Sequence, residues 1–381
     1  MTLLQTGVVG TSNKENEHRV PIHPCHLDRI PTELRDHLVF ERGYGAPFGV
    51  ADDDLAAACG GLADRDTLLA DFELVLLPKP LAMDLRLLRE GGIMWSWPHC
   101  VQQREITQVA IDRRQTLLAF EAMFRWRQGR KGLHILYKNN ELAGYCSVLH
   151  ALELVGRDGY YGPRQSVAVL SFGSVARGAV YALRGRGFSD LRIYTQRPSH
   201  LVADQVPGCT YLQMGREDGP VWAQGSDGRR RPLLDDLAGV DVIVNGILQD
   251  TDDPLMFLTE NELDRLRPGT LIVDVSCDEG MGFPFARPTS FEDPMFDVGP
   301  LRYYAVDHTP TYLWDAASWE ISEALLPYLE TVMRGPEAWE KNETLRRAVE
   351  IREGGIVNPK ILSFQHREKN YPHPIRLGAR L

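Results

Sequence analysis

The sequence predicts an α/β protein of two domains, because two series of strand-like apolar stretches alternate with amphipathic stretches of helical period. The first series lies within residues 1–140 and the second within residues 166–307. The chain has 381 residues, which is more than one ordinary hydrophobic core accommodates. We therefore expect one domain made of residues 1–140 and 311–381, and a second domain made of residues 141–310.

The first series indicates a parallel sheet, since each strand-like stretch is followed by a helical one. Its strand-like stretches are TGVVG (6–10), HLVFERG (37–43), DFELVLLP (71–78), GGIMWSWP (91–98) and QTLLAFEAM (115–123). A helix over residues 139–156 is expected next, with Asn139 or Asn140 as its N-cap.

The second series has the strand count of a doubly wound sheet. Its six stretches are SVAVLSF (166–172), DLRIYTQ (190–196), CTYLQM (209–214), DVIVNGI (241–247), TLIVDVS (270–276) and RYYAVD (302–307). The amphipathic segment 316–333 is expected to form a helix that packs back onto the first domain. Residues 366–381 are polar and basic without periodicity, which predicts a surface tail.

Composition excludes several classes of function. The formal net charge of −10 argues against a nucleic-acid partner. Six single cysteines lack the spacing of a zinc site, so no metal is expected, and they indicate a reducing compartment. No leader or apolar run of ~18 residues is present, which predicts a cytoplasmic protein without a membrane partner. The sequence leaves the oligomeric state open, a homo-oligomer included.

Three residues supply the parts needed to handle a 2-oxo acid. Arg19 can bind a carboxylate through two parallel hydrogen bonds, Lys79 can polarise a carbonyl oxygen, and His99 can transfer a proton near neutral pH. We therefore interpret Lys79 and His99 as catalytic and Arg19 as substrate-binding. The alternative for each is an ordinary ion pair or a satisfied polar side chain at a strand end.

A dinucleotide-binding loop is predicted after the first strand of the second series. The pattern G-x-G-x-x-G/A is matched by Ser171, Gly173 and Ala176, with Ser171 in place of the first glycine. Gly173 allows close backbone approach to a pyrophosphate, which Ser174 and Val175 would meet at the start of a helix. An ordinary strand-loop-helix turn is the alternative.

The residues after the next strand favour NADP(H) over NAD(H). An NAD site usually has an acidic residue there to bind the ribose 2′-hydroxyl. This chain has Thr195, Gln196 and Arg197 instead, and Arg197 can pair with a 2′-phosphate while the other two donate hydrogen bonds. If Arg197 is only a solvated loop charge, this preference is lost.

Several ordered motifs resemble the alanine dehydrogenase and pyridine nucleotide transhydrogenase superfamily, which includes saccharopine dehydrogenase and N5-(carboxyethyl)ornithine synthase. They are ENEHRVPIHP, LLPKP, WPH, LLAFEAM, NNELAGY, the cofactor loop, GTLIVDVSCDEG and YYAVDHTP. The resemblance implies two Rossmann-like domains with the active site in a central cleft, the first domain being completed by the C-terminal helices. It also implies the roles given above for Arg19, Lys79 and His99, and places Asp278 beside the nicotinamide, with Asp274 and Glu279 acidic in the same loop.

Within this superfamily, VDHTP (306–310) and Glu121 resemble the saccharopine and carboxyethylornithine branch. Asp307, with His308 beside it, and Glu121 can receive the cationic end of a diamino acid, which ammonia would not require. The alternative for Asp307 is a cap on the following helix.

These observations predict an NADPH-dependent, opine-type oxidoreductase. It would condense a 2-oxo acid, with pyruvate favoured, with the side-chain amine of a basic amino acid such as ornithine or lysine, and would reduce the imine. An amino-acid dehydrogenase that uses free ammonia is the first alternative. A non-catalytic NADP-binding sensor is the second, although such a protein has no need of an acid/base pair.

Overall fold

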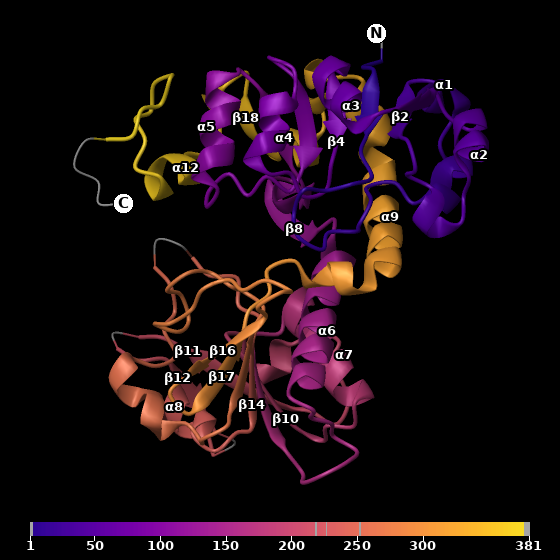
Figure 1. Ribbon diagram of the computed structural model, residues 1–381. Helices are drawn as coiled ribbons and strands as arrows, with labels where there is room; N and C mark the ends of the chain where they lie inside the picture. Colours follow the sequence, from indigo (N-terminus) through magenta and orange to yellow (C-terminus); the bar gives the residue numbers. More distant parts are fainter. Residues whose placement is uncertain (1–2, 218, 226, 251–252, 377–381) are drawn as a thin grey trace. The chain divides into compact units, whose positions relative to one another are not determined.

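The computed structural model describes residues 3–217, 219–225, 227–250 and 253–376. The chain forms two compact units: unit 1 comprises Met1–Tyr137 and Trp314–Leu381, and unit 2 comprises Lys138–Leu313 (Figure 1). The prediction of two α/β domains, the first built from both ends of the chain, is confirmed. No helix within the described ranges is long and apolar enough to cross a membrane.

Unit 1 is built on an eight-stranded sheet with the order β19-β18-β6-β5-β4-β1-β2-β3. All pairings from β3 to β6 are parallel, and β18 and β19 add an antiparallel edge. The strands are β1 (Thr6–Val8), β2 (Leu38–Glu41), β3 (Gly61–Ala63), β4 (Leu74–Leu76), β5 (Ile93–Ser96), β6 (Thr116–Ala119), β18 (Val349–Arg352) and β19 (Gly355–Ile356). A separate hairpin consists of β7 (Phe124–Arg127) and β8 (Arg130–His134).

Helices cover both faces of this sheet, which is why its central strands are apolar without interruption. Along β4, Leu74 and Leu76 belong to one core cluster, whereas Val75 belongs to the other. The helices are η1 (Pro24–Arg29), α1 (Thr32–Arg35), η2 (Ala46–Phe48), α2 (Asp52–Ala57), α3 (Arg65–Asp71), α4 (Ala82–Leu87), α5 (Arg104–Asp112), η3 (Phe120–Ala122), α9 (Trp314–Met333), α10 (Pro336–Trp339), α11 (Glu343–Arg346) and α12 (Pro359–Phe364).

The long helix α9 returns to unit 1 and forms part of its core, as the sequence predicted. Its residues Ile321, Leu325 and Leu329 lie in the same buried cluster as Leu74 and Leu76 of β4. Figure 1 shows α9, in orange, running along the side of unit 1.

The expected surface tail is exposed over most of the described residues 366–376, but Arg367 and His373 within it are buried. Arg367 is only 1% exposed; its guanidinium donates to Gln108 Oε1 at 2.8 Å and to the carbonyl oxygen of His373 at 3.1 Å. Arg367 is therefore buried in spite of its charge, because its guanidinium finds hydrogen-bond partners inside the fold. Residues 377–381 lie outside the described residues.

Unit 2 contains a nine-stranded sheet with the order β13-β12-β11-β10-β9-β14-β15-β17-β16. All six predicted stretches form strands: β9 (Ser166–Leu170), β10 (Asp190–Thr195), β11 (Thr210–Gly215), β14 (Val242–Asn245), β15 (Leu271–Asp274) and β17 (Leu301–Tyr304). These six pair in parallel and have the spatial order 3-2-1-4-5-6 of a doubly wound dinucleotide-binding fold. Antiparallel additions are β12 (Trp222–Gln224), β13 (Arg230–Pro232) and β16 (Met295–Val298).

Two helices of unit 2 cross in backbone contact. They are α6 (Tyr137–Leu154) and α7 (Ser174–Gly185), drawn next to each other in Figure 1. A Cβ on Gly144 would lie 1.9 Å from the Val175 carbonyl oxygen, and a Cβ on Gly178 would lie 1.7 Å from that of Glu141. Both positions therefore require glycine, and the contact places the N-terminus of α7. The remaining helices are η4 (Ser199–Leu201), α8 (Leu233–Leu237), η5 (Glu260–Arg265) and η6 (Thr309–Leu313).

The helix predicted over residues 139–156 begins two residues earlier than expected, at Tyr137. Asn139 and Asn140 therefore lie in its first turn, and the prediction that one of them is the N-cap is wrong.

Candidate active site

Three of the predicted residues of unit 1 meet at the carboxyl ends of neighbouring parallel strands. Lys79 follows β4, His99 follows β5 and Glu121 follows β6, so the chain brings them to one edge of the sheet. Lys79 Nζ lies 3.1 Å from His99 Nε2. Because an ammonium group only donates hydrogen bonds, this contact requires Nε2 to be the acceptor, with the imidazole proton on Nδ1.

The backbone of His99 is held in a left-handed conformation with φ of 45°. Its N–H donates to Glu121 Oε1 at 2.7 Å, and its Nδ1 lies 3.8 Å from the same oxygen. The next residue is held as well, since Gln365 Nε2 donates to the Cys100 carbonyl oxygen at 2.6 Å. A rare backbone conformation fixed from two sides orients the imidazole, as is common at functional sites.

Arg19 is buried and its guanidinium is oriented by two neighbours. Its Nε and Nη2 donate to the two carboxylate oxygens of Glu17, at 2.8 and 2.5 Å. The guanidinium also lies 5.1 Å from the ring centre of Trp97, two residues before His99. These contacts place Arg19 next to the loop of His99.

A second buried carboxyl lies near Glu121. Glu350, on β18 at an irregularity in its pairing with β6, is 6% exposed and accepts from Asn358 Nδ2 at 2.7 Å. Burial, with the charge of Glu350, raises the pKa of Glu121 to about 8. The side chain of Glu121 is 29% exposed, but its Oε2 is buried and contacts no hydrogen-bond donor among the described residues. Burial likewise raises the pKa of Glu350 to about 7.

We expect Glu350→Gln to stabilise the protein at pH 8 but not at pH 5. The folded chain binds the Glu350 proton more tightly than the unfolded chain, whose pKa is about 4.3. The contribution of protonated Glu350 to the free energy of unfolding is therefore fully present below pH 4 and is lost as the pH rises through 7. Gln carries no buried negative charge at pH 8, so the free energy of unfolding of the variant should exceed that of the wild type by on the order of 1–3 kcal/mol at this pH.

Denaturant unfolding of both proteins at pH 5 and pH 8 measures this difference. Glu337→Gln, at an exposed position of α10, is the control and should show no such change with pH. Equal effects of Glu350→Gln at the two pH values would contradict the expectation.

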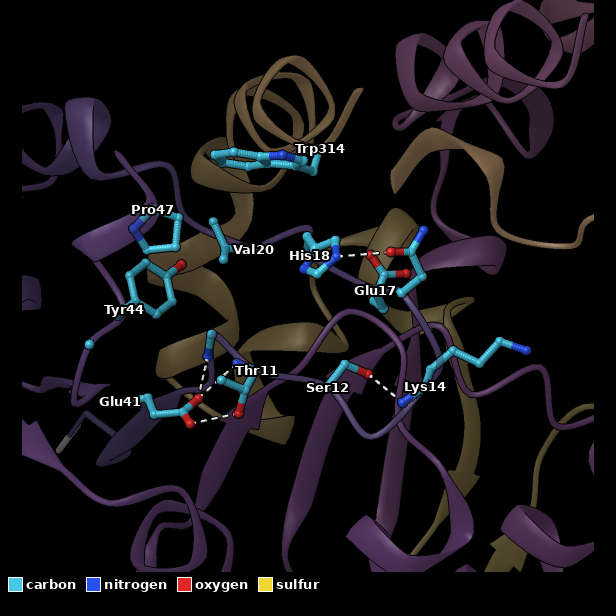
Figure 2. Close-up of a pocket in the computed structure, with 13 residues that line it drawn as sticks. Thr11, Ser12, Lys14, Glu17, His18, Val20, Glu41, Tyr44, Pro47 and Trp314 are labelled. Carbon is cyan, nitrogen blue, oxygen red and sulfur yellow. Dashed lines mark hydrogen bonds between the residues drawn. The ribbon is translucent and has the colours of Figure 1, made fainter. Parts of the chain in front are cut away.

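Next to these residues, unit 1 contains a pocket of about 440 Å³ at the carboxyl ends of β1 and β2 (Figure 2). Figure 2 shows Trp314 on one side, Tyr44 and Pro47 on another, and Glu41 on a third, with His18 facing them. The pocket is lined by Gly10, Thr11, Ser12, Lys14, Asn16, Glu17, His18, Val20, Glu41, Gly43, Tyr44, Pro47 and Trp314.

In unit 2 the predicted cofactor loop lies between β9 and α7. Ser171 has φ of 90°, which is the left-handed region that favours glycine, and it occupies the position of the first fingerprint glycine. Gly173 is exposed, and a Cβ there would meet only Ser171 Oγ, at 3.8 Å. Ser174 and Val175 begin α7, so their N–H groups belong to a helix N-terminus of the kind that binds phosphate.

The residues predicted to contact the ribose follow β10. Thr195 ends the strand and is buried, and its Oγ1 accepts from the Arg197 N–H at 3.3 Å. Gln196 and Arg197 are exposed. No ion pair of Arg197 occurs in the part of the chain that the structure describes.

The three acidic residues at and after the end of β15 differ in burial. Asp274 is fully buried; it accepts from Asn245 Nδ2 at 3.0 Å and from the Tyr303 hydroxyl at 2.8 Å. Glu279 is exposed to solvent. Asp278 is half-buried, and burial raises its pKa to about 6.

Asp307 pairs with its neighbour. Its Oδ1 lies 2.5 Å from His308 Nδ1, while 28% of the Asp307 side chain is exposed and the His308 side chain is fully buried. The carbonyl oxygen of Val306 accepts from Cys277 Sγ at 3.8 Å, so the loop of Asp278 lies beside this segment.

Several residues that build these sites were not found from the sequence. Glu17, Trp97, Glu350 and Gln365 act through contacts with residues distant in the chain or through burial. Only Glu17 could have been recognised from the local sequence, because a carboxylate two residues before an arginine can reach its guanidinium.

Models of the alanine dehydrogenase/PNT family match the chain twice, the N-terminal domain over residues 8–143 and the C-terminal domain over residues 225–359. An N(5)-(carboxyethyl)ornithine synthase of Clostridium botulinum is 25% identical over 327 residues, which cover 82% of this chain and 90% of the relative. An alanine dehydrogenase of Mycobacterium tuberculosis is 24% identical over 369 residues, which cover 93% and 95%.

Solved structures show the same fold. An L-alanine dehydrogenase superposes with a TM-score of 0.74 at 21% identity, covering 94% of this chain and 98% of the other. A transhydrogenase from Sinorhizobium meliloti superposes with a TM-score of 0.67 at 18% identity, covering 93% and 99%. This chain therefore shares its two-domain α/β architecture with both solved structures.

Proposed function

The chain belongs to the alanine dehydrogenase/PNT family, and from this premise we propose that it reductively condenses a 2-oxo acid with the side-chain amine of a basic amino acid. Its general class, an NAD(P)-dependent oxidoreductase of amino acids, follows from the family. We favour pyruvate with ornithine or lysine, because N(5)-(carboxyethyl)ornithine synthases are among the relatives that cover most of the chain.

The residues of unit 1 have distinct roles in this proposal. The amine nitrogen attacks the carbonyl carbon, and the resulting carbinolamine loses water to give an imine. Arg19 binds the carboxylate of the oxo acid and Lys79 donates a hydrogen bond to the carbonyl oxygen. His99 moves the two amine protons in turn to that oxygen, the first to form the carbinolamine hydroxyl and the second to release it as water.

The observation that supports this proposal most directly is the 3.1 Å contact between Lys79 Nζ and His99 Nε2. The amino group of Lys79 and the imidazole of His99 are thereby brought together at one point of the sheet edge. The Arg19 guanidinium is directed by Glu17 and Trp97 in the same region. The carboxylate and the carbonyl oxygen are the features of the 2-oxo acid in this reaction, and the amine supplies the proton that is transferred.

The residues of unit 2 fit a dinucleotide. The space above Gly173, the N-terminus of α7 and the left-handed Ser171 provide backbone N–H groups for a pyrophosphate. Thr195, Gln196 and Arg197 would bind a ribose 2′-phosphate, and Asp278 would contact the nicotinamide. When bound, the reduced nicotinamide supplies the hydride that converts the imine to a secondary amine.

We expect Arg197→Glu to change the cofactor preference from NADPH toward NADH. The wild-type guanidinium pairs with the 2′-phosphate, whereas a carboxylate repels it and accepts from a ribose hydroxyl. NADPH binding should weaken roughly ten- to a hundredfold. Fluorescence titration with each cofactor measures the change.

Arg229→Glu is the matched control, because Arg229 lies between β12 and β13 with 88% of its side chain exposed. It makes the same charge change in unit 2 and should leave the cofactor preference as in the wild type. A wild-type enzyme that already prefers NADH would overturn the NADP(H) proposal.

The decisive assay follows NADPH oxidation with pyruvate and either ornithine, lysine, neutral amino acids or ammonia. Turnover should be fastest with a basic amino acid, and the product should be a secondary amine that mass spectrometry identifies. Absence of turnover with every amine would refute the proposal.

The second candidate is an amino-acid dehydrogenase that uses ammonia. Alanine dehydrogenases match 93% of the chain, more than the 82% matched by the Clostridium synthase. If ammonia is the better amine, this function replaces the first.

A further inference from the structure

The pocket beside β1 and β2 is continuous with the proposed catalytic residues. Ser12, which lines it, donates from Oγ to the carbonyl oxygen of Lys79 at 3.0 Å. Glu17, which also lines it, holds the guanidinium of Arg19. The pocket wall and the catalytic residues are thus parts of one hydrogen-bonded structure.

The pocket combines both signs of charge with apolar walls. Glu41 is 7% exposed; its Oε2 accepts from the Gly10 and Thr11 N–H groups, and its Oε1 accepts from the Thr11 hydroxyl at 2.6 Å. A carboxylate oxygen accepts two hydrogen bonds, so Oε1 has capacity for a further donor. The imidazole of His18 and the side chain of Lys14 also line the pocket.

The remaining walls suit a hydrocarbon chain. Trp314, Val20, Pro47 and the ring of Tyr44 line the pocket. The Tyr44 hydroxyl is directed elsewhere, because it donates to the Ile22 carbonyl oxygen at 2.6 Å. Its face in the pocket is therefore the aromatic ring.

We propose that this pocket binds the α-ammonium and α-carboxylate end of the basic amino acid, with Glu41 facing the ammonium and His18 facing the carboxylate. The methylene chain would lie against Trp314 and Pro47, and the side-chain amine would extend toward Lys79 and His99. This assignment rests on the function proposed above and names the part of the site that selects its second substrate.

Two arguments favour an amino acid as the occupant. A volume of about 440 Å³ is in the range of small organic ligands and far exceeds what ammonia needs. The other carboxyl group at this edge, Glu121, is already occupied by the His99 N–H, and its pKa of about 8 leaves it mostly uncharged at pH 7. Glu41 is the better partner for a cation.

The test measures steady-state kinetics and direct binding for two variants with matched controls. His18→Gln removes the imidazole that faces the proposed carboxylate, and Trp314→Ala removes the aromatic wall of the pocket. His37→Gln is the control for the first, because His37 precedes β2 at the opposite edge of the sheet and contacts Gln5. Trp319→Ala is the control for the second, on the same helix and 43% exposed.

We expect His18→Gln and Trp314→Ala each to raise the KM for lysine or ornithine about tenfold or more, with less than a twofold change in the KM for pyruvate. The controls should change neither constant. For the wild type, 1,5-diaminopentane, which is lysine without its carboxylate, should have a higher KM than lysine. In His18→Gln the KM values of the two amines should differ less than in the wild type.

Two results would overturn the assignment while leaving the proposed function intact: variants with an unchanged KM for the amino acid, or equal increases for both substrates. If the enzyme uses only ammonia, the proposed function fails. Calorimetric titration with lysine then tests separately whether the pocket binds an amino acid. Lysine binding by the wild type that is lost in His18→Gln would support an amino-acid site, and absence of lysine binding would refute it.

Discussion

Replacing His99 with alanine should lower kcat/KM by about 10²- to 10⁴-fold, the usual contribution of a positioned acid/base group. In the proposed reaction, the imidazole moves the two amine protons in turn to the carbonyl oxygen, so both the formation and the dehydration of the carbinolamine depend on it. The imidazole is oriented for this by the contact of Nε2 with Lys79 Nζ and by the hydrogen bond from its backbone N–H to Glu121.

The cofactor should still bind to the His99 variant, because the cofactor loop belongs to unit 2 and His99 to unit 1. Cofactor fluorescence therefore separates loss of chemistry from loss of folding. His37→Ala, at the opposite edge of the same sheet, is the control and should keep wild-type activity. A His99→Ala enzyme within threefold of the wild type would assign His99 a structural role.

The second large effect is expected for Lys79→Met, which should lower kcat/KM by about 10²- to 10³-fold, as does removal of one hydrogen-bond donor to a reacting oxygen. Met keeps most of the side-chain volume but has no ammonium group to polarise the carbonyl. The loss should appear in kcat as well as in the KM for the oxo acid, since the donor contacts the oxygen before and during reaction.

Lys79→Arg should restore only part of this activity, because a planar guanidinium cannot occupy the position of a compact ammonium 3.1 Å from His99 Nε2. Thermal unfolding of both variants serves as the control for folding. A change in melting temperature with unaltered kinetics would show that Lys79 lies outside the reaction.

What the sequence could predict about the fold was the existence and order of its elements. All six strands expected in residues 166–307 are present, because buried parallel strands carry continuous apolar runs that can be read locally. Boundaries were less accurate: the helix expected from Asn139 begins at Tyr137. Arg367 shows a deeper limit, since its burial depends on Gln108, a residue distant in the chain.

For the candidate site too, some features could be predicted from the sequence and others depended on the tertiary structure. By itself, the sequence predicted Arg19, Lys79 and His99 as residue types with the required chemistry, because carboxylate binding, carbonyl polarisation and proton transfer each need particular side chains. Only the tertiary structure decided where these side chains lie and what they contact. The 3.1 Å contact of Lys79 with His99, the buried carboxyl of Glu350 behind Glu121 and the pocket walled by Trp314 join segments far apart in the chain. Such distances and burials arise from packing, and packing is a property of the folded chain that no local pattern encodes.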